Sequence, residues 1–259
     1  MSEPALVEEQ HGRVLVLRIN RPDARNALNF EVLSGLDAGL QRAAADPVIG
    51  AVVLAGTGDR TFSAGMDLRE QGPPEGVTEE ERRRVIDAFV RLLDGESPVP
   101  LVGAANASAL GGGFEILLAC DLVVASSDAR FGLPEVKRGL FPGGNGTTLA
   151  ARIPMAVAME LALTGEPIDA ATALDLHLVN AVVPPEDVLA TALAYAERVA
   201  ANAPLSLAAI RELVRLGASD GTRYRERRAH WQGVVFGSED AAEGARAFME
   251  KREPVWQGR

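Results

Sequence analysis

Residues 111–120 read GGGFEILLAC, so three glycines run straight into an acid, Glu115, and a short apolar segment. Glycines ahead of a helix leave its first backbone N–H groups free to meet a ligand, with the positive end of the helix dipole behind them. Burying a carboxylate just inside an apolar segment is costly unless the group has a partner or a chemical task. The stretch therefore predicts a site that stabilises a developing oxyanion beside an acid or base.

Outward from this stretch, predicted strands alternate with predicted helices. Apolar runs predict strands over residues 14–19, 49–55, 99–105 and 122–125. Asn29 is the expected N-cap of a helix that reaches about residue 44, and residues 79–93 form a second helix. Residues 70–78 are polar and rich in glycine and proline, and we expect them to be a mobile segment and a candidate lid.

From Ile153 onward the pattern is helical. Helices are predicted over residues 156–163, 169–174, 186–201, 205–216, 222–235 and 239–251. Ser238 is the expected N-cap of the last one, with acids in its first turn. The chain is thus expected to be α/β, with a catalytic core over residues 1–195 and a helical region over 196–259 that packs against another subunit.

Composition limits the class of protein. The chain has 259 residues, 47% of them hydrophobic, which suits one globular domain with a sizeable core. A net charge of −10 argues against nucleic-acid binding. No apolar run is long enough for a membrane span, and the acidic N-terminus does not resemble a secretory signal. The single cysteine, Cys120, is expected in the core, and a cytoplasmic location is expected.

Two further stretches are candidates for chemistry. Residues 61–68 read TFSAGMDL and allow a ligand to approach the main chain, although alone they favour the reading of an ordinary strand-to-helix turn. Glu135 follows Pro134 in a glycine-rich segment, twenty residues after Glu115. Taken alone, it is as readily a surface charge paired with Lys137 or Arg138. Two carboxylates in one dry pocket, however, push their pKa values apart, so that one can donate a proton and the other can accept one. Adding water to a double bond requires both.

Other chemistries fit poorly. The three histidines, His11, His177 and His230, are scattered without ligand spacing, so no metal site is expected. A Gly-x-Ser-x-Gly elbow, a Walker motif and a complete dinucleotide fingerprint are all absent from the sequence.

Taken in order, the motifs resemble the crotonase (enoyl-CoA hydratase/isomerase) family over nearly the whole chain. They are residues 21–28, 62–68, 109–115, 120–125, 131–135, 238–244 and 248–256. The resemblance implies a crotonase-like spiral of ββα units with a helical C-terminal trimerisation region, assembled as a homotrimer or homohexamer. It further implies a lyase of fatty acid metabolism, an enoyl-CoA hydratase whose substrate is an acyl-CoA thioester.

The resemblance also implies roles for residues. The N–H groups of Ala64 and Gly112 are expected to form the oxyanion hole, with Glu115 and Glu135 as the catalytic acids. Glu135 is the expected donor of the proton to C2, and Glu115 the base that positions water. The residues expected to contact coenzyme A are Ala24, Arg25, Ala27, Ala64, Gly65, Met66, Asp67, Leu68, Gly111 and Lys251. Lys251 is expected to come from a neighbouring subunit, and no metal or redox cofactor is expected, since coenzyme A is part of the substrate.

The chain departs from the family pattern in one loop. Asn145 stands where relatives often have glycine, and Asn is the other residue best able to adopt φ > 0. Thr148-Leu149 also stands where relatives commonly have Gln-Arg. The resemblance therefore does not identify the acyl group of the substrate. The candidate pocket residues, for which core packing is the alternative, are Met66, Leu110, Phe114, Leu140, Phe141 and Trp231 or Phe236. A carnitinyl-CoA-type dehydratase, another acyl-CoA lyase or isomerase of the family, and a catalytically silent acyl-CoA-binding protein remain alternative functions.

Overall fold

The computed structural model describes residues 3–70 and 74–259. Its first sheet has six strands in the order β1 (Leu6–His11), β2 (Val14–Ile19), β3 (Ala51–Gly56), β5 (Leu101–Ala105), β7 (Leu122–Ser126) and β10 (Ala181–Val183). The second sheet has the order β4 (Thr61–Ser63), β6 (Ser108–Leu110), β8 (Arg130–Gly132) and β9 (Ile168–Asp169). Strands β1 and β9 pair antiparallel with their neighbours, and every other pair is parallel.

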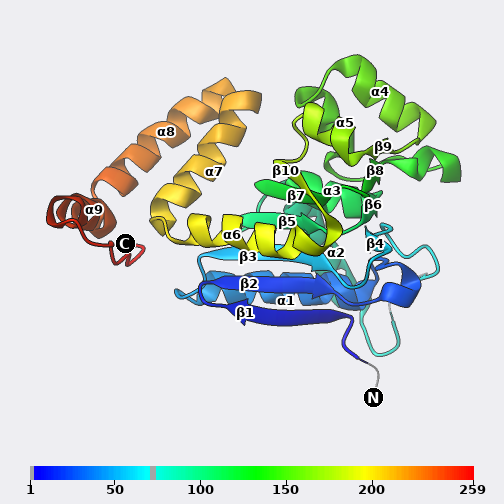
Figure 1. The fold of residues 1–259 in the computed structure, drawn as a ribbon, viewed down its shortest axis with the longest axis horizontal. Helices are drawn as coiled ribbons and strands as arrows, with labels where there is room; N and C mark the ends of the chain where they lie inside the picture. The colour runs from blue at the N-terminus through cyan, green and yellow to red at the C-terminus, as the bar shows by residue number, and fades with distance from the viewer. Residues whose placement is uncertain (1–2, 71–73) are drawn as a thin grey trace.

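The helices follow the strands in a repeating order. They are α1 (Phe30–Ala45), α2 (Glu79–Leu93), α3 (Gly112–Ala119), α4 (Met155–Thr164), α5 (Ala170–Asp175), α6 (Val188–Ala200), α7 (Pro204–Ser219), α8 (Gly221–Phe236) and α9 (Glu239–Glu250). From β3 onward the chain runs through a strand of the first sheet, a strand of the second sheet and then a helix, which gives β3-β4-α2 and β5-β6-α3. This repetition is the spiral of ββα units expected from the sequence (Figure 1).

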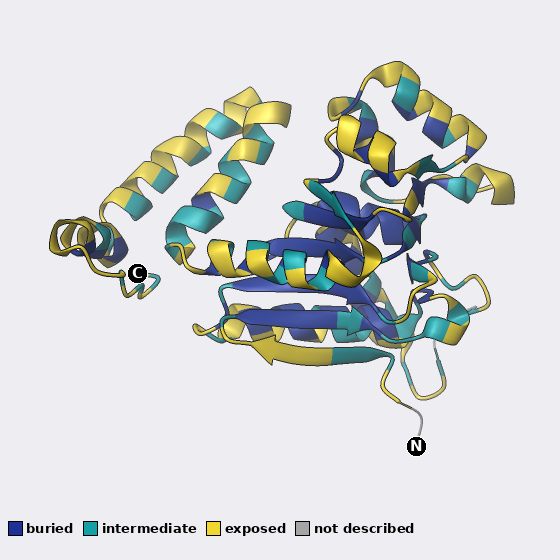
Figure 2. Ribbon diagram, in the orientation of Figure 1, coloured by how far each residue is buried: buried dark blue, intermediate teal, exposed yellow. Residues whose placement is uncertain are grey.

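The first sheet is covered on both faces, and its central strands β3 and β5 are buried at every position. Successive side chains of a strand point to opposite faces, so Leu15 and Leu17 of β2 pack in the cluster that includes the apolar face of α1. Val14 and Val16 pack in the cluster that includes the alanine face of α6. The buried strands between exposed helices are the dark layer in Figure 2.

Several expectations about elements are confirmed. The Asn29 side chain accepts a hydrogen bond from the Val32 N–H at 3.1 Å and caps α1. Ser238 caps α9 by accepting from the Ala241 N–H at 3.0 Å. Cys120 is buried, and burial raises the pKa of its thiol far above the ordinary value. Of the expected lid, residues 71–73 lie outside the described residues.

Other expectations were wrong or incomplete. The region after Ile153 was expected to be wholly helical, but β9 and β10 interrupt it. The expected core boundary at residue 195 falls inside α6, whose buried face continues to Ala200. Helices α7 to α9 pack mainly on one another and project from the sheets (Figures 1 and 2). No helix within the described residues is long and apolar enough to cross a membrane.

Candidate active site

The second sheet brings three separate motifs to one edge. Its strands β4, β6 and β8 run parallel, with Ser63 opposite Ala109 and Leu110 opposite Gly132. The chain leaves these three strands on the same side, because the carboxyl ends of parallel strands meet at one edge. Residues 64–69, 111–115 and 133–138 are therefore neighbours, although the sequence separates them widely.

Helix α3 begins at this edge and packs directly on β4. Gly111 precedes it with a φ of 55°, a conformation that favours glycine. A Cβ added to Gly113 would lie 2.5 Å from the Ser63 carbonyl oxygen, so only glycine permits this approach. The Gly112 N–H is the first in the helix and has no intrahelical acceptor. It is available to a ligand in the cavity that Gly112 lines.

The structure corrects the other half of the expected oxyanion hole. The Ala64 N–H donates to the Arg25 carbonyl oxygen at 3.1 Å, so it is already engaged. Two residues further on, the Met66 N–H donates to no group among the described residues. Met66 lies close to Gly112, as a Cβ added to Gly112 would be only 3.8 Å from the Met66 side chain. The pair of unengaged donors is therefore Met66 and Gly112.

Glu115 lies in the first turn of α3 and is only 4% exposed. Its Oε1 accepts hydrogen bonds from the Gly144 N–H at 2.9 Å and the Gly146 N–H at 3.0 Å. Between these glycines, the Asn145 side chain donates to the carbonyl oxygens of Leu93 at 2.7 Å and Glu115 at 3.1 Å. Asn145 does not adopt a positive φ, so its side chain rather than its backbone distinguishes this loop from a glycine loop.

Glu135 lies near the start of the short 3₁₀ helix Pro134–Arg138 and faces the same cavity. Its buried Oε2 has no hydrogen-bond partner among the described residues. Lys137 pairs instead with Glu166 at 2.6 Å, and no ion pair joins Glu135 to Arg138 in the described part of the chain. Burial, with a smaller contribution from the Glu115 charge, raises the pKa of Glu135 above the ordinary glutamate value. Glu135 is therefore suited to hold a proton.

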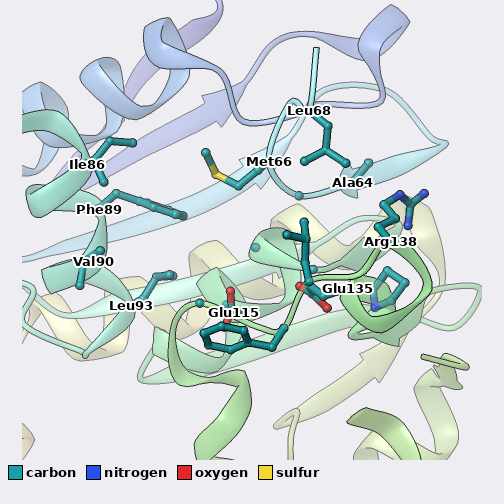
Figure 3. Close-up of a pocket in the computed structure, with 17 residues that line it drawn as sticks. Ala64, Met66, Leu68, Ile86, Phe89, Val90, Leu93, Glu115, Glu135 and Arg138 are labelled. Carbon is teal, nitrogen blue, oxygen red and sulfur yellow. The ribbon is translucent and has the colours of Figure 1, made fainter. Parts of the chain in front are cut away.

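The two glutamates share a cavity of about 420 Å³. Figure 3 shows Glu115 and Glu135 on the side opposite Met66 and Leu68. The remaining wall is apolar and comes from α2 through Ile86, Phe89, Val90 and Leu93. A dry wall next to two carboxyl groups strengthens every electrostatic interaction inside the cavity.

Only some of the residues expected to line the acyl pocket lie in the wall of the cavity. Met66, Leu140 and Phe141 line the cavity. Phe114 does not, because it is buried against Phe131 with ring centroids 5.5 Å apart. The cavity lining also does not include Leu110, Trp231 or Phe236.

A second hollow of about 330 Å³ adjoins the first and shares Ala64, Met66 and Leu68 with it. It contains most of the residues expected to contact coenzyme A, namely Ala24, Arg25, Ala27, Ala64, Met66, Asp67 and Leu68, whereas Gly65 and Gly111 line the first cavity. Arg69, which sequence reasoning missed, also lines the hollow and binds Asp67 with two hydrogen bonds of 3.0 Å. These bonds hold the pKa of the Asp67 carboxyl well below its usual range.

Lys251 is not brought to this hollow within one chain. It ends α9, which lies at the opposite end of the molecule from the sheet edge that holds the cavity (Figure 1). Within residues 3–70 and 74–259, no three His, Cys, Asp or Glu side chains are grouped so that they could hold a metal ion. The sheet edge thus brings together two carboxyl groups, of Glu115 and Glu135, and two backbone donors, of Met66 and Gly112.

Comparison with known proteins places this geometry in context. A family model described as enoyl-CoA hydratase/isomerase matches residues 9–259. The (E)-benzylidenesuccinyl-CoA hydratase of Thauera aromatica is 38% identical, over 96% of this chain and 98% of that protein. The short-chain-enoyl-CoA hydratase of Clostridium acetobutylicum is also 38% identical, over 96% of this chain and 95% of that protein.

A solved structure agrees in fold over the full length. The crystal structure of enoyl-CoA hydratase from Mycobacterium tuberculosis H37Rv superposes with a TM-score of 0.85 and 40% identity. The match covers 99% of this chain and 100% of that one.

Proposed function

Because this chain belongs to the enoyl-CoA hydratase/isomerase (crotonase) family, we propose that it catalyses the reversible addition of water to a 2-enoyl-CoA thioester. The observation that carries the proposal is the pairing of two carboxyl groups, Glu115 and Glu135, in one cavity beside the N-terminus of α3. A family member that only shifts a double bond needs a single acid. Two acids provide both the base and the proton donor that hydration requires.

We place the thioester oxygen between the N–H groups of Met66 and Gly112. Both donors are unengaged, and the helix dipole of α3 favours negative charge at this point. The coenzyme A moiety then runs into the adjoining hollow, where Arg25 is available to its phosphates and Arg69, paired with Asp67, lies beside them. The acyl group extends from the thioester toward the glutamates and the apolar wall of α2.

The proposed reaction uses one water molecule held between the glutamates. Glu115 has both of its backbone hydrogen bonds on Oε1, which leaves Oε2 to accept a proton from that water. As the water oxygen bonds to C3, the electron pair of the double bond moves through C2 to the thioester oxygen. The Met66 and Gly112 donors stabilise this enolate, and each such donor is worth roughly 10²–10³ in rate. Glu135 then gives its proton to C2, and the proton on Glu115 returns to Glu135 before the next turnover.

We also propose that α7 to α9 build a homotrimer, alone or paired into a homohexamer. These helices carry large apolar side chains on their exposed faces, including Phe236 and Phe248. A neighbouring subunit in such an assembly would supply Lys251 to the coenzyme A hollow, since this chain's own Lys251 lies at the far end of the molecule.

The test is hydration of crotonyl-CoA by the purified protein, followed as loss of the enoyl absorbance and appearance of the 3-hydroxy product. The proposal predicts turnover in both directions. A protein that binds butyryl-CoA but turns over no enoyl-CoA from a panel of short, long and branched esters would instead be a silent binder. Activity confined to carnitinyl-CoA would favour the dehydratase alternative.

A further inference from the structure

The catalytic cavity contains one cation that the hydration mechanism does not use. Arg138 lines it together with Glu115 and Glu135, and every other residue in its lining is uncharged. Its guanidinium makes no ion pair with any residue in the described ranges, and no hydrogen bond from it to one is found there. Lys137 beside it is paired with Glu166 at 2.6 Å, whereas the exposed Arg138 side chain has no such partner among the described residues.

Neither glutamate of the cavity forms a hydrogen bond or an ion pair with this guanidinium. Glu115 is satisfied by the N–H groups of Gly144 and Gly146. Glu135 forms no bond to Arg138 although both belong to the same 3₁₀ helix. An Arg guanidinium presents a planar fork that matches a carboxylate in a bidentate pair. The Arg138 side chain is exposed and lines the cavity, so its guanidinium is available there to an anionic group of the substrate.

The phosphates of coenzyme A are the less suitable partner. The hollow that adjoins the cavity has its own cations, Arg25 and Arg69, and Arg138 does not line that hollow. Figure 3 shows the apolar side chains of α2 on one side of the glutamates and Arg138 on the other. The reacting double bond lies beside the glutamates, so an anionic group of the acyl moiety that reaches Arg138 must lie close to that bond.

We propose that Arg138 binds a free carboxylate that the acyl group carries one or two carbons from its double bond. The preferred substrates are thus 2-enoyl-CoA thioesters with a second, unesterified carboxyl group near the double bond. This inference rests on the proposed function, because it assigns the acyl group of the same site. The α2 wall takes the apolar part of such a substrate while Arg138 takes the charged part.

The test compares two esters that differ in one group. Glutaconyl-CoA is crotonyl-CoA with a carboxylate on C4, and the readout is the ratio of kcat/KM for the charged ester to that for the neutral one. Wild type is expected to prefer glutaconyl-CoA. Arg138→Gln should lower the ratio about tenfold or more, chiefly through KM, because a polar site loses its ion pair. Arg138→Lys should retain part of the preference, since it keeps the charge but not the fork.

Lys137→Gln is the matched control, because it removes the neighbouring cation whose partner is Glu166, and it should leave the ratio within about twofold. Removing the Arg138 charge also changes the electrostatics at Glu135, but this affects both esters and cancels in the ratio. Equal losses for the two esters in Arg138→Gln would assign Arg138 to the coenzyme A moiety and overturn the proposal. An unchanged ratio would overturn it as well.

A binding measurement separates this proposal from the proposed function. Glutaryl-CoA and butyryl-CoA are the saturated counterparts of the two esters, and calorimetry gives their Kd values without turnover. We expect wild type to bind glutaryl-CoA more tightly than butyryl-CoA, and Arg138→Gln to lose that preference. Failure of hydration with an intact, Arg138-dependent preference would contradict the hydratase assignment alone. Equal affinities in wild type would contradict the carboxylate site alone.

Discussion

At the scale of single residues, the two glutamates of the cavity are held in opposite ways. Glu115 is buried and accepts two backbone hydrogen bonds on one oxygen, which fixes its orientation. Glu135 has a buried oxygen without a partner, and burial raises its pKa. The same apolar surroundings that make Glu135 a good proton donor make its ionised form costly.

This cost predicts that Glu135→Gln stabilises the fold. Because the pKa of Glu135 is higher in the folded state than in the unfolded chain, the folded state binds more protons between those two pKa values. Stability contributed by the protonated carboxyl is therefore present at low pH and is lost as pH rises through the folded pKa. Glutamine does not titrate, so the melting temperature of Glu135→Gln should exceed that of wild type at pH 8.

The melting-temperature difference between Glu135→Gln and wild type should shrink as pH falls below about 4, where the carboxyl is protonated in both states. Thermal unfolding of both proteins across this pH range measures it. A difference that grows toward low pH would show that the sign of the pKa shift is wrong.

The second residue-scale prediction separates Met66 from Ala64. Replacing the amide N–H of Met66 with an ester oxygen, by incorporating the α-hydroxy acid, removes one proposed oxyanion donor without changing the side chain. We expect kcat for crotonyl-CoA to fall roughly 10²–10³-fold. The same ester at Ala64 is the matched control, because it removes only the bond to the Arg25 carbonyl oxygen. If the ester at Ala64 lowered kcat more than the ester at Met66, Ala64 rather than Met66 would be the oxyanion donor.

Among these residues, the sequence alone predicted both glutamates and Gly112 as candidates. It could not assign the second donor, because the choice between Ala64 and Met66 depends on a hydrogen bond from Ala64 to Arg25, a residue 39 positions earlier in another loop. The loop at Asn145 was likewise interpreted through backbone conformation. Its contribution is instead a side-chain amide that joins the end of α2 to α3.

At the scale of elements, α3 connects the fold to the chemistry. Its N-terminus supplies Gly112 and Glu115 to the cavity, while its last carbonyl groups accept from Arg152 at 2.8 Å and Arg215 at 3.1 Å. Cations at the C-terminal end and an open N-terminal end both suit the helix dipole. The helix is short and wholly buried, so its position is set by how closely it approaches β4.

Gly113→Ala tests that approach. The added Cβ would lie 2.5 Å from the Ser63 carbonyl oxygen and 2.7 Å from its Cβ, so α3 or β4 must shift. We expect a loss of about 1–3 kcal/mol in the free energy of unfolding, as for other overpacked sites, measured by urea denaturation. Gly112→Ala is the control for stability, since its Cβ would meet its nearest neighbour, Leu28, at 3.4 Å. Equal stability of the two variants would contradict the packing.

The long elements were predictable because each has a full hydrophobic period or a cap. The predicted helix over residues 79–93 coincides with α2, and the predicted strand over 14–19 coincides with β2. The strands of the second sheet were not predicted. They are two or three residues long, too short for a periodic signal, and they form only because they pair with one another. β1 was missed because its exposed, acidic residues suit an edge strand.

At the scale of the whole molecule, the chain has a core around two sheets and a projecting group of helices. Helix α7 is fastened to the core by Arg211 and Arg215, which bind the Asp121 carboxylate at 2.7 and 2.8 Å. Beyond α7, the exposed apolar side chains are Phe236, Phe248, Met249 and Val255, with Phe248 86% exposed. Large apolar side chains gathered on one exposed region mark an interface.

We therefore expect the native mass to be three or six times the chain mass of 27.3 kDa, measured by light scattering after size exclusion. Phe248→Asp should shift the protein toward monomers, because it places a charge in the proposed interface. Leu163→Asp is the control, since Leu163 is also exposed but lies in α4, away from the projecting helices (Figure 1). A monomeric wild type, or dissociation by both variants alike, would contradict this assembly.

The most direct test of the two-acid mechanism is the kcat of Glu115→Gln and of Glu135→Gln for crotonyl-CoA, with the affinity of each variant for butyryl-CoA measured alongside. The mechanism predicts that each substitution lowers kcat by roughly 10²–10⁴-fold while butyryl-CoA affinity stays within about threefold of wild type. Near-full activity in both variants would contradict it.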